Sequence, residues 1–494
     1  MLEGFKGGQL SNFLTRDEVE DIHSTSVRIL AEVGLQCRSD RIFKLFEDAG
    51  VEVFMKENKT KRLIKIPESL TKEALKNAPS SFPIHARNPE YNIKYEKSKV
   101  HFTYGASATP YIMDVETGEY RQPSKQDFAA AVRLGDALQN FHTVGAVGGA
   151  FDVHRKVQYE HEWEVLFNNT SKHISYWTPS GYAARKALDM AESIVGGPDE
   201  LRKNPILSLG GETVSPLIVP KELEGMLEFA LAGLPVLSAP IPFGGATAPI
   251  TMAGNYALCN AESLFILIMI QLVNRGGPFM YFANSFQLPF TAQGQYGPEM
   301  ITGGILISGQ MAKYYDLPSI CIGPLSLSKT PDAQAGAEIM RGVILPAMVG
   351  INFIGMSGHL SSGNVASMEA AVMCDEIIGH VSALFADAEI NEETLAFDVI
   401  KEVGPGGNFM THKHTLKHIR RAFLAKHRDY VFFDASSENK WIKGEGQDAY
   451  LRIKSKLKKI LKEHEPDSLP KQVQDRISEI VREAENEKIK KNRG

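Results

Sequence analysis

Seven short apolar runs recur along the middle of the chain, roughly every 30 to 45 residues. Each is long enough for one strand, and the segments between them can hold a helix and its loops. The runs are Thr143–Val147, His173–Trp177, Pro205–Leu209, Pro235–Pro240, Pro278–Ala283, Pro318–Ile322 and Ile351–Met356. Such a series predicts an α/β fold, a closed (β/α)8 TIM barrel, rather than a doubly wound sheet. We expect the eighth strand either after Leu384 or near Tyr111–Asp114.

Two flanking sections have a different pattern. Thr15 and Glu18 form a capping-box pattern before apolar residues at helical spacing, and Gly34 marks the helix stop. Further helices are expected around Ser39–Ala49 and Pro67–Asn77. From Asp448 onwards, mixed charges at helical spacing indicate a solvated helix. We therefore predict an N-terminal helical cap over residues 1–100, a catalytic barrel over 101–400 and a C-terminal helical extension, packed on the barrel, over 401–494.

Composition narrows the class of protein. A formal net charge of −5 gives no reason to expect nucleic-acid binding. The first residues lack a secretory-signal pattern, and the longest apolar run, Ser263–Val273, is about half of what a bilayer span needs. We expect a soluble cytoplasmic protein without a membrane partner. The four cysteines form no C-x-x-C pair, so buried thiols are expected rather than disulfides or a zinc site.

Chemistry in such a barrel is expected where the strands end. The residues there are mostly small and uncharged, without the paired acids or metal ligands that a hydrolytic barrel needs. His359 is the histidine best placed for function, although a structural role is equally consistent with the sequence. Lys329 could form a Schiff base, but pairing with Asp332 or orienting a substrate carboxylate fits better. His412, His414 and His418 lack a metalloprotease pattern, and we expect no bound metal.

Aromatic residues also gather near the expected strand ends. They include Tyr104, Trp177, Phe286 and Phe353. Each alone is typical of a core position, but several converging on one mouth would suit a methylated ammonium, which aromatic faces attract.

Several linked motifs then point to one family. In order they are LTRDEVEDIHSTSVRILAEVGL, TYGASATPYIMDVETGEYRQPSKQDF, FGGATAPITMAGNYALCNAE, LSLSKTPDAQAGAE, SGHLSSGNVASMEAAVMCDEIIG and GPGGNFMTHKHTLKHIRR. In sequence and spacing they resemble the trimethylamine methyltransferase superfamily, over nearly the whole chain. The resemblance implies a (β/α)8 barrel that moves a methyl group from an amine to Co(I) of a corrinoid (cobalamin) carried by a separate partner protein.

One departure from the family matters. The namesake branch carries pyrrolysine, which the resemblance places in the region of Pro324–Lys329, and no such residue is written here. The chain is therefore similar to the non-pyrrolysine branch, which resembles glycine betaine:corrinoid methyltransferases. A quaternary amine already bears its charge, so its leaving group is a neutral tertiary amine and no proton donor is required.

On this resemblance we assign roles. His359, or else Lys329, would meet a substrate carboxylate, and Tyr104, Trp177, Phe286 and Phe353 would surround the ammonium. Asn284, Gln287 and Gln334 would orient the substrate through polar contacts. The loop of Phe243, Gly244, Gly245 and Thr247 would leave room for the corrinoid, although a tight turn explains its glycines equally well.

Other interpretations stay open. No arginine clamp is visible at the mouth, so carnitine, proline betaine, γ-butyrobetaine, choline, tetramethylammonium and trimethylamine remain alternatives to glycine betaine. A Schiff-base lyase using Lys329 and a non-catalytic quaternary-ammonium-binding protein are the competing functions. A homo-oligomer is expected only because symmetric dimers are common.

Overall fold

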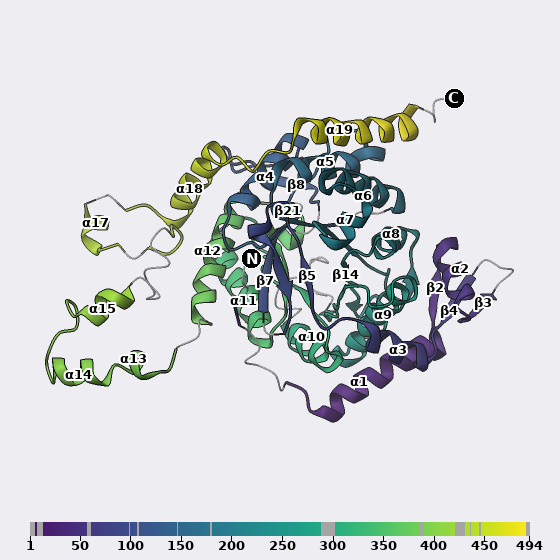
Figure 1. Cartoon of the computed structure of the whole chain (residues 1–494), viewed down its shortest axis with the longest axis horizontal. Coiled ribbons are helices and arrows are strands. Elements are labelled where there is room, and N and C mark those ends of the chain that lie inside the picture. Colours follow the sequence, from purple (N-terminus) through teal and green to yellow (C-terminus); the bar gives the residue numbers. More distant parts are fainter. Residues whose placement is uncertain are drawn as a thin grey trace.

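The structure is a computed structural model. It describes residues 5–6, 13–56, 61–97, 99–105, 108–145, 147–177, 180–287, 302–385, 389–419, 430–434, 436–443 and 446–490. Figure 1 shows a ring of strands surrounded by helices, with a slender extension to one side.

Eight parallel strands form the barrel. In chain order they are β7 (Lys99–Tyr104), β10 (Thr143–Val144), β11 (His173–Trp177), β12 (Leu207–Gly211), β14 (Val236–Ser238), β16 (Phe279–Met280), β18 (Ile320–Ile322) and β19 (Phe353–Ser357). The ring closes beside β16 and β18, where the Tyr281 amide donates to the Pro318 carbonyl at 2.8 Å and the Ile320 amide donates to the Tyr281 carbonyl at 2.9 Å. The predicted (β/α)8 fold is confirmed.

The placement of the eighth strand was wrong. It is β7, the first barrel strand in the chain, whereas Tyr111–Met113 forms β8 in a small separate sheet with β9 (Tyr120–Arg121), β20 (His359–Leu360) and β21 (Val365–Ala366). Polar residues alternate with apolar ones along β7, which hides it from a search for continuous apolar runs. Two of them, His101 and Thr103, are nevertheless buried, at 1% and 2% exposure.

The helices that cover the barrel follow its strands around the ring (Figure 1). They are α4 (Lys125–Ala137), α5 (Gln158–Asn169), α6 (Gly181–Val195), α7 (Pro198–Lys203), α8 (Glu224–Ala232), α9 (Met252–Val273), α10 (Thr302–Tyr315), α11 (Ala333–Val349) and α12 (Met368–Leu384). Helix α9 is long and apolar enough to cross a membrane, but nearly all of it is buried against α1, α3 and α8. An all-round apolar helix in that position is a core helix.

The N-terminal section contains strands as well as helices, so its description as helical was incomplete. Its helices are α1 (Arg16–Arg28), α2 (Asp40–Asp48) and α3 (Glu68–Asn77), and its strands are β1 (Phe5–Lys6), β2 (Leu35–Cys37), β3 (Glu52–Lys56), β4 (Lys61–Lys65), β5 (Phe82–Ile84) and β6 (Ile93–Tyr95). The Thr15 capping box is present, and the helical turn after α1 ends at Gly34 with φ 77°. Strand β2 also pairs with β13 (Ile218–Val219), from the loop after β12.

The C-terminal section has two parts. Helix α18 (Ala449–Glu463) packs on α12 and α4, and helix α19 (Lys471–Glu485) packs on α6 and α5. Before them, the arm, defined as residues 389–419 and 436–443, extends away from the barrel (Figure 1). It carries α13 (Glu392–Leu395), α14 (Phe397–Val403), α15 (Lys413–His418) and α17 (Glu438–Ile442). The three-way division at residues 100 and 400 remains a prediction.

Close backbone contact between β18 and α11 yields a stability prediction. A Cβ at Gly342 would lie 2.1 Å from the Gly323 carbonyl oxygen, so Gly342→Ala requires the helix to move away from the barrel. We expect the free energy of unfolding to fall by about 1–3 kcal/mol, the usual cost of overpacking, measured by urea-induced unfolding.

The matched control is Gly336→Ala in the same helix, where the nearest atom, Cζ of Phe432, lies at an ordinary 3.4 Å. Alanine favours a helix over glycine by about 1 kcal/mol, so this variant should be neutral or more stable. Equal effects of the two substitutions would contradict the packing explanation.

Candidate active site

A cavity occupies the barrel at the carboxyl ends of its strands. Its volume is about 760 Å³, open mouth included. Side chains from most of the barrel strands line it: Thr103, Ser175, Trp177, Glu212, Leu237, Ala239, Ile241, Phe282, Ile320, Cys321, Ile322, Phe353, Gly355 and Met356. Among these described lining residues there is one carboxylate, Glu212, and no lysine, arginine or histidine. The wall is otherwise apolar, apart from the hydroxyls of Thr103 and Ser175.

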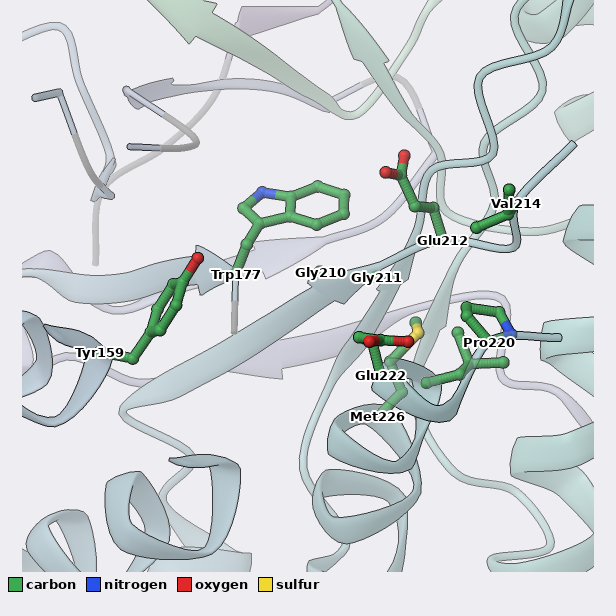
Figure 2. A pocket seen from close by; sticks show the side chains of 10 residues that line it. Tyr159, Trp177, Gly210, Gly211, Glu212, Val214, Pro220, Glu222 and Met226 are labelled. Carbon is green, nitrogen blue, oxygen red and sulfur yellow. The ribbon is translucent and has the colours of Figure 1, made fainter. Parts of the chain in front are cut away.

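A second cleft adjoins this cavity and shares Trp177 and Glu212 with it. In Figure 2 the indole of Trp177 and the carboxylate of Glu212 extend to the same side of the end of β12, while Glu222 and Met226 lie on the other side. An aromatic face and a carboxylate therefore border the same space, which is the arrangement that holds an organic cation.

Two glycines allow this arrangement. The indole lies over Gly210, where a Cβ would come within 2.5 Å of Cε2 of Trp177. At Gly211 a Cβ would lie 2.4 Å from the sulfur of Met226, a residue of α8. The Gly-Gly pair at the end of β12 thus makes room for neighbouring side chains, and the chain then turns so that Glu212 enters the cleft.

A second acid lies behind Glu212. Glu262 on α9 is fully buried, and it accepts hydrogen bonds of 2.6 Å from the Ser215 hydroxyl and from the Leu217 amide. Burial raises the pKa of Glu262 to about 7. Partial desolvation in the cleft, and then repulsion by Glu262, raise the pKa of Glu212 to about 7 as well, although the side chain of Glu212 is itself exposed to solvent. Each acid disfavours the charged form of the other.

Chemistry was predicted from the sequence at the strand ends, but Glu212 was given no role. Nothing local distinguishes this glutamate, because its partner Glu262 lies on another helix. The available signal was that Glu212 is an acidic residue directly after a predicted barrel strand.

Of the predicted aromatic residues, Trp177 and Phe353 line the cavity and Tyr104 does not. Side chains alternate in direction along a strand, so Thr103 points into the barrel while Tyr104 points outward against Gly135 of α4 and Phe141. Tyr104 is fully buried, and its hydroxyl has no hydrogen-bond partner among the residues that the structure describes. The structure thus gives Tyr104 a packing position.

Phe286 and Gln287 form β17, which pairs with β15 (Phe243–Gly244) in a short ribbon after the barrel strands. The Phe243 and Phe286 rings lie 6.0 Å apart. Asn284 is fully buried just before this ribbon, and neither end of its amide has a partner among the described residues.

The small residues after Phe243 form a tight turn. The Phe243 carbonyl accepts hydrogen bonds from the amides of Ala246, Thr247 and Ala248, and the Thr247 hydroxyl accepts one from the Phe243 amide. Gly245 has φ 89°, and a Cβ at Gly244 would lie 2.4 Å from the side-chain oxygen of Gln287. Turn geometry and close packing account for both glycines. The role of the loop toward a corrinoid remains a prediction.

The structure does not bring the remaining predicted residues to the cavity wall. His359 is buried in β20, where its ring contacts the Ser357 carbonyl at 3.1 Å. Lys329 is exposed and donates to the Leu327 carbonyl at 2.7 Å, and Gln334 is exposed on α11, where it bonds Glu338. These positions follow from loop and helix geometry, which residue type alone does not reveal.

The histidines of the THKHTLKH segment lie on the arm. His412 faces Glu402 at 3.5 Å, His418 faces Glu393 at 3.3 Å, and the rings of His414 and His418 lie 4.4 Å apart. Within the part of the chain that the structure describes, no group of three or more histidine, cysteine or acidic side chains could hold a metal ion. The four cysteines are buried and unpaired by disulfides, as expected.

Residues 6–488 match the family described as Trimethylamine methyltransferase (MTTB). The chain belongs to the trimethylamine methyltransferase family. The resemblance inferred from the sequence motifs is therefore confirmed, and so is the prediction of a methyltransferase.

Curated relatives of this family member align over almost its whole length. It is 32% identical over 477 residues to Trimethylamine methyltransferase MttB of Desulfitobacterium hafniense (strain DSM 10664 / DCB-2), covering 95% of this chain and 93% of that protein. It is 29% identical over 474 residues to Glycine betaine methyltransferase of Desulfitobacterium hafniense (strain Y51), covering 95% and 96%. Among solved structures, a dihydropteroate synthase from Stenotrophomonas maltophilia covers 61% of this chain and 99% of its own, at 13% identity and a TM-score of 0.36, too distant to bear on function.

The packing of Trp177 on Gly210 can be tested without knowing the substrate of this methyltransferase. Gly210→Ala places a methyl group where the indole now lies, so the indole must move. We expect the near-ultraviolet circular dichroism of the tryptophans to change while the far-ultraviolet spectrum stays the same.

Gly355→Ala serves as the control, because Gly355 also lines the cavity but a Cβ there makes only ordinary contacts, 3.4 Å from Cγ2 of Thr103 and 3.7 Å from the Cys321 carbonyl oxygen. Its near-ultraviolet spectrum should match that of the wild type. If Gly210→Ala also matched it, the indole would not occupy the position described.

Proposed function

We propose that this methyltransferase moves a methyl group from a small quaternary amine to Co(I) of a corrinoid carried by a partner protein. The observation that supports it most directly is the pairing of the Trp177 indole with the Glu212 carboxylate at the mouth of an otherwise apolar barrel cavity. A quaternary ammonium offers no N–H to a hydrogen-bond acceptor, so an aromatic face, a negative charge and apolar walls are the contacts that suit it.

The chain's own residues would bind and orient the amine. Trp177 and Phe353 provide aromatic surface, Glu212 balances the positive charge, and the apolar wall formed by Leu237, Ile241 and Phe282 limits water around the reacting methyl group. Once the methyl group leaves, the remaining tertiary amine is neutral, and its attraction to Glu212 is lost. Positioning and removal of water are therefore the main work of the site.

The corrinoid, when presented by its partner, would supply Co(I) as the nucleophile that accepts the methyl group. The rim of the site is compatible with a broad planar group. Gly245 and Ala246 are exposed on the turn after β15, and neither carries a large side chain. This supports the expected approach over the Phe243–Thr247 loop without fixing its geometry.

The methyl donor is a narrower question. The resemblance to non-pyrrolysine enzymes favours glycine betaine or a related betaine. Identities of 32% to a trimethylamine methyltransferase and 29% to a glycine betaine methyltransferase do not choose between these amines. The charge of the cavity bears on this choice more directly.

The competing functions receive less support. A Schiff-base lyase needs its lysine in the cavity, and the described wall contains none, since Lys329 is exposed and bonded to the Leu327 carbonyl. A binding protein without transfer would share the cation site and differ only in assay, where it would bind amines without oxidising Co(I).

Methyl transfer itself is the decisive test. Anaerobic protein is mixed with cob(I)alamin or a cognate corrinoid protein and a panel of quaternary amines plus trimethylamine, and the Co(I) absorption band is followed. Its loss with one amine supports the proposal and identifies the donor. If no amine consumes Co(I), although the protein is folded and the corrinoid reduced, transfer is rejected.

The role of Trp177 can be measured in the same assay. Trp177→Ala removes the cation–π contact, worth about 1–2 kcal/mol in a desolvated site, so the KM for the amine should rise roughly five- to thirtyfold.

Trp441→Ala is the control, because Trp441 is half exposed on the arm and does not line the cavity. It should keep the wild-type KM. A similar rise in both variants would show a general effect on the protein rather than loss of a cation contact.

We also propose a homo-oligomer. The arm exposes many large apolar side chains, including Ile390 at 75%, Phe397 at 71%, Met410 at 75% and Ile442 at 79% exposure. Extended apolar surface of this kind is typical of subunit contacts. Sedimentation velocity should detect a species larger than 54.5 kDa, and a monomer at micromolar concentration would contradict the proposal.

A further inference from the structure

The charge around the cavity has a single sign. Glu212 enters it, and Glu262 lies buried behind Glu212. Opposite these acids, the described cavity wall carries no lysine, arginine or histidine. A substrate in the cavity therefore meets negative charge without a compensating cation.

We propose that Glu212 determines substrate specificity and selects a small quaternary ammonium without a carboxylate, such as tetramethylammonium or a choline-type amino alcohol. Glu262 acts through Glu212 as a positioning residue. This inference rests on the proposed function and narrows its substrate class against glycine betaine.

The argument from chemistry is direct. The carboxylate and the ammonium of glycine betaine are separated by one carbon atom, so both enter the cavity together. With the ammonium against Trp177 and Glu212, the betaine carboxylate would also lie close to Glu212. Like charges repel, and a carboxylate that leaves water for the cavity needs cations or several donors. Among its described lining residues the cavity offers no cation, and its side-chain donors are the hydroxyls of Thr103 and Ser175, the Trp177 indole N–H and the Cys321 thiol, a set that suits an alcohol better than a carboxylate.

The buried acid also explains how Glu212 is held. The carboxylate of Glu262 accepts hydrogen bonds from the Ser215 hydroxyl and the Leu217 amide, and it thereby fixes the loop that carries Glu212. The same proximity disfavours a negative charge on Glu212 when the cavity is empty. A bound cation reverses this effect, because it stabilises the carboxylate form. Substrate binding and proton release from Glu212 are thus coupled.

The sign of this coupling follows from the groups that face Glu212. Glu262 from α9 is the charged neighbour of Glu212. Tyr159 from α5 and Cys321 from β18 line the same two cavities, whereas Glu222, from the turn before α8, lies on the other side of the end of β12 (Figure 2). Burial raises the pKa values of Tyr159 and Cys321, so both stay neutral near pH 7. Below the pKa of Glu212, a cation must displace a proton to bind, and its affinity rises with pH. Above that pKa, Glu212 is already charged and the affinity levels off.

Calorimetric titration of the full chain, without corrinoid, tests this inference. Tetramethylammonium, choline and glycine betaine are titrated between pH 6 and 8 in buffers with different enthalpies of ionisation, which reports the protons released on binding. We expect tetramethylammonium or choline to bind at least tenfold more tightly than glycine betaine. Proton release should approach one per amine near pH 6 and vanish near pH 8.

Three variants assign the effect. Glu212→Gln should weaken ammonium binding at pH 8 at least tenfold, abolish proton release and narrow the difference between choline and glycine betaine. Glu262→Gln should lower the pH at which proton release disappears. Glu222→Gln is the matched control, since Glu222 lies on the other side of the end of β12 (Figure 2), and it should behave as the wild type.

Two results would overturn the inference. One is tighter binding of glycine betaine than of the carboxylate-free amines. The other is an unchanged affinity and proton release in folded Glu212→Gln. If glycine betaine nevertheless donates a methyl group to Co(I), the proposed function still holds and only the proposed specificity is rejected. If no quaternary amine binds and none consumes Co(I), both the inference and the proposed function fail.

Discussion

The geometry of the site depends on the closure of the barrel. Two hydrogen bonds between Tyr281 and the segment from Pro318 to Ile320 join the last open edges of the sheet. Closure forces alternate side chains of every strand either into the barrel or outward against a helix. It also brings residues from distant parts of the sequence to one ring. Trp177 and Glu212 meet there because their strands, β11 and β12, are neighbours in that ring.

This constraint explains how much of the fold was predictable. Seven barrel strands were visible as apolar runs, because a strand of a parallel sheet is buried on both faces. The eighth strand, β7, places the polar residues His101 and Thr103 inside the barrel, and burial there does not depend on hydrophobicity. The strands β3 and β4 of the N-terminal section were also missed, since charged residues interrupt them and they pair only with each other and with β2.

The site was less predictable than the fold. Trp177 was found because it ends a recognisable strand. Tyr104 was predicted to line the cavity, but neighbouring side chains of a strand point in opposite directions, and here Thr103 points inward. The raised pKa of Glu212 results from its place in the cleft and from the nearby charge of Glu262. Glu262 is distant in sequence, and the packing of α9 behind the loop after β12 brings it close. Lys329 and His359 carry suitable chemistry, but loop geometry directs one to solvent and buries the other.

The pairing of β13 with β2 links the N-terminal section to the site mechanically. Ile218 pairs with Gln36 and Val219 pairs with Cys37, and this strand belongs to the same loop as Glu212. The loop is therefore anchored at two points, by Glu262 on helix α9 and by strand β2 of the N-terminal section. A substitution that displaces β2 would therefore disturb the loop at the mouth of the barrel through backbone hydrogen bonds, although β2 lies in the N-terminal section.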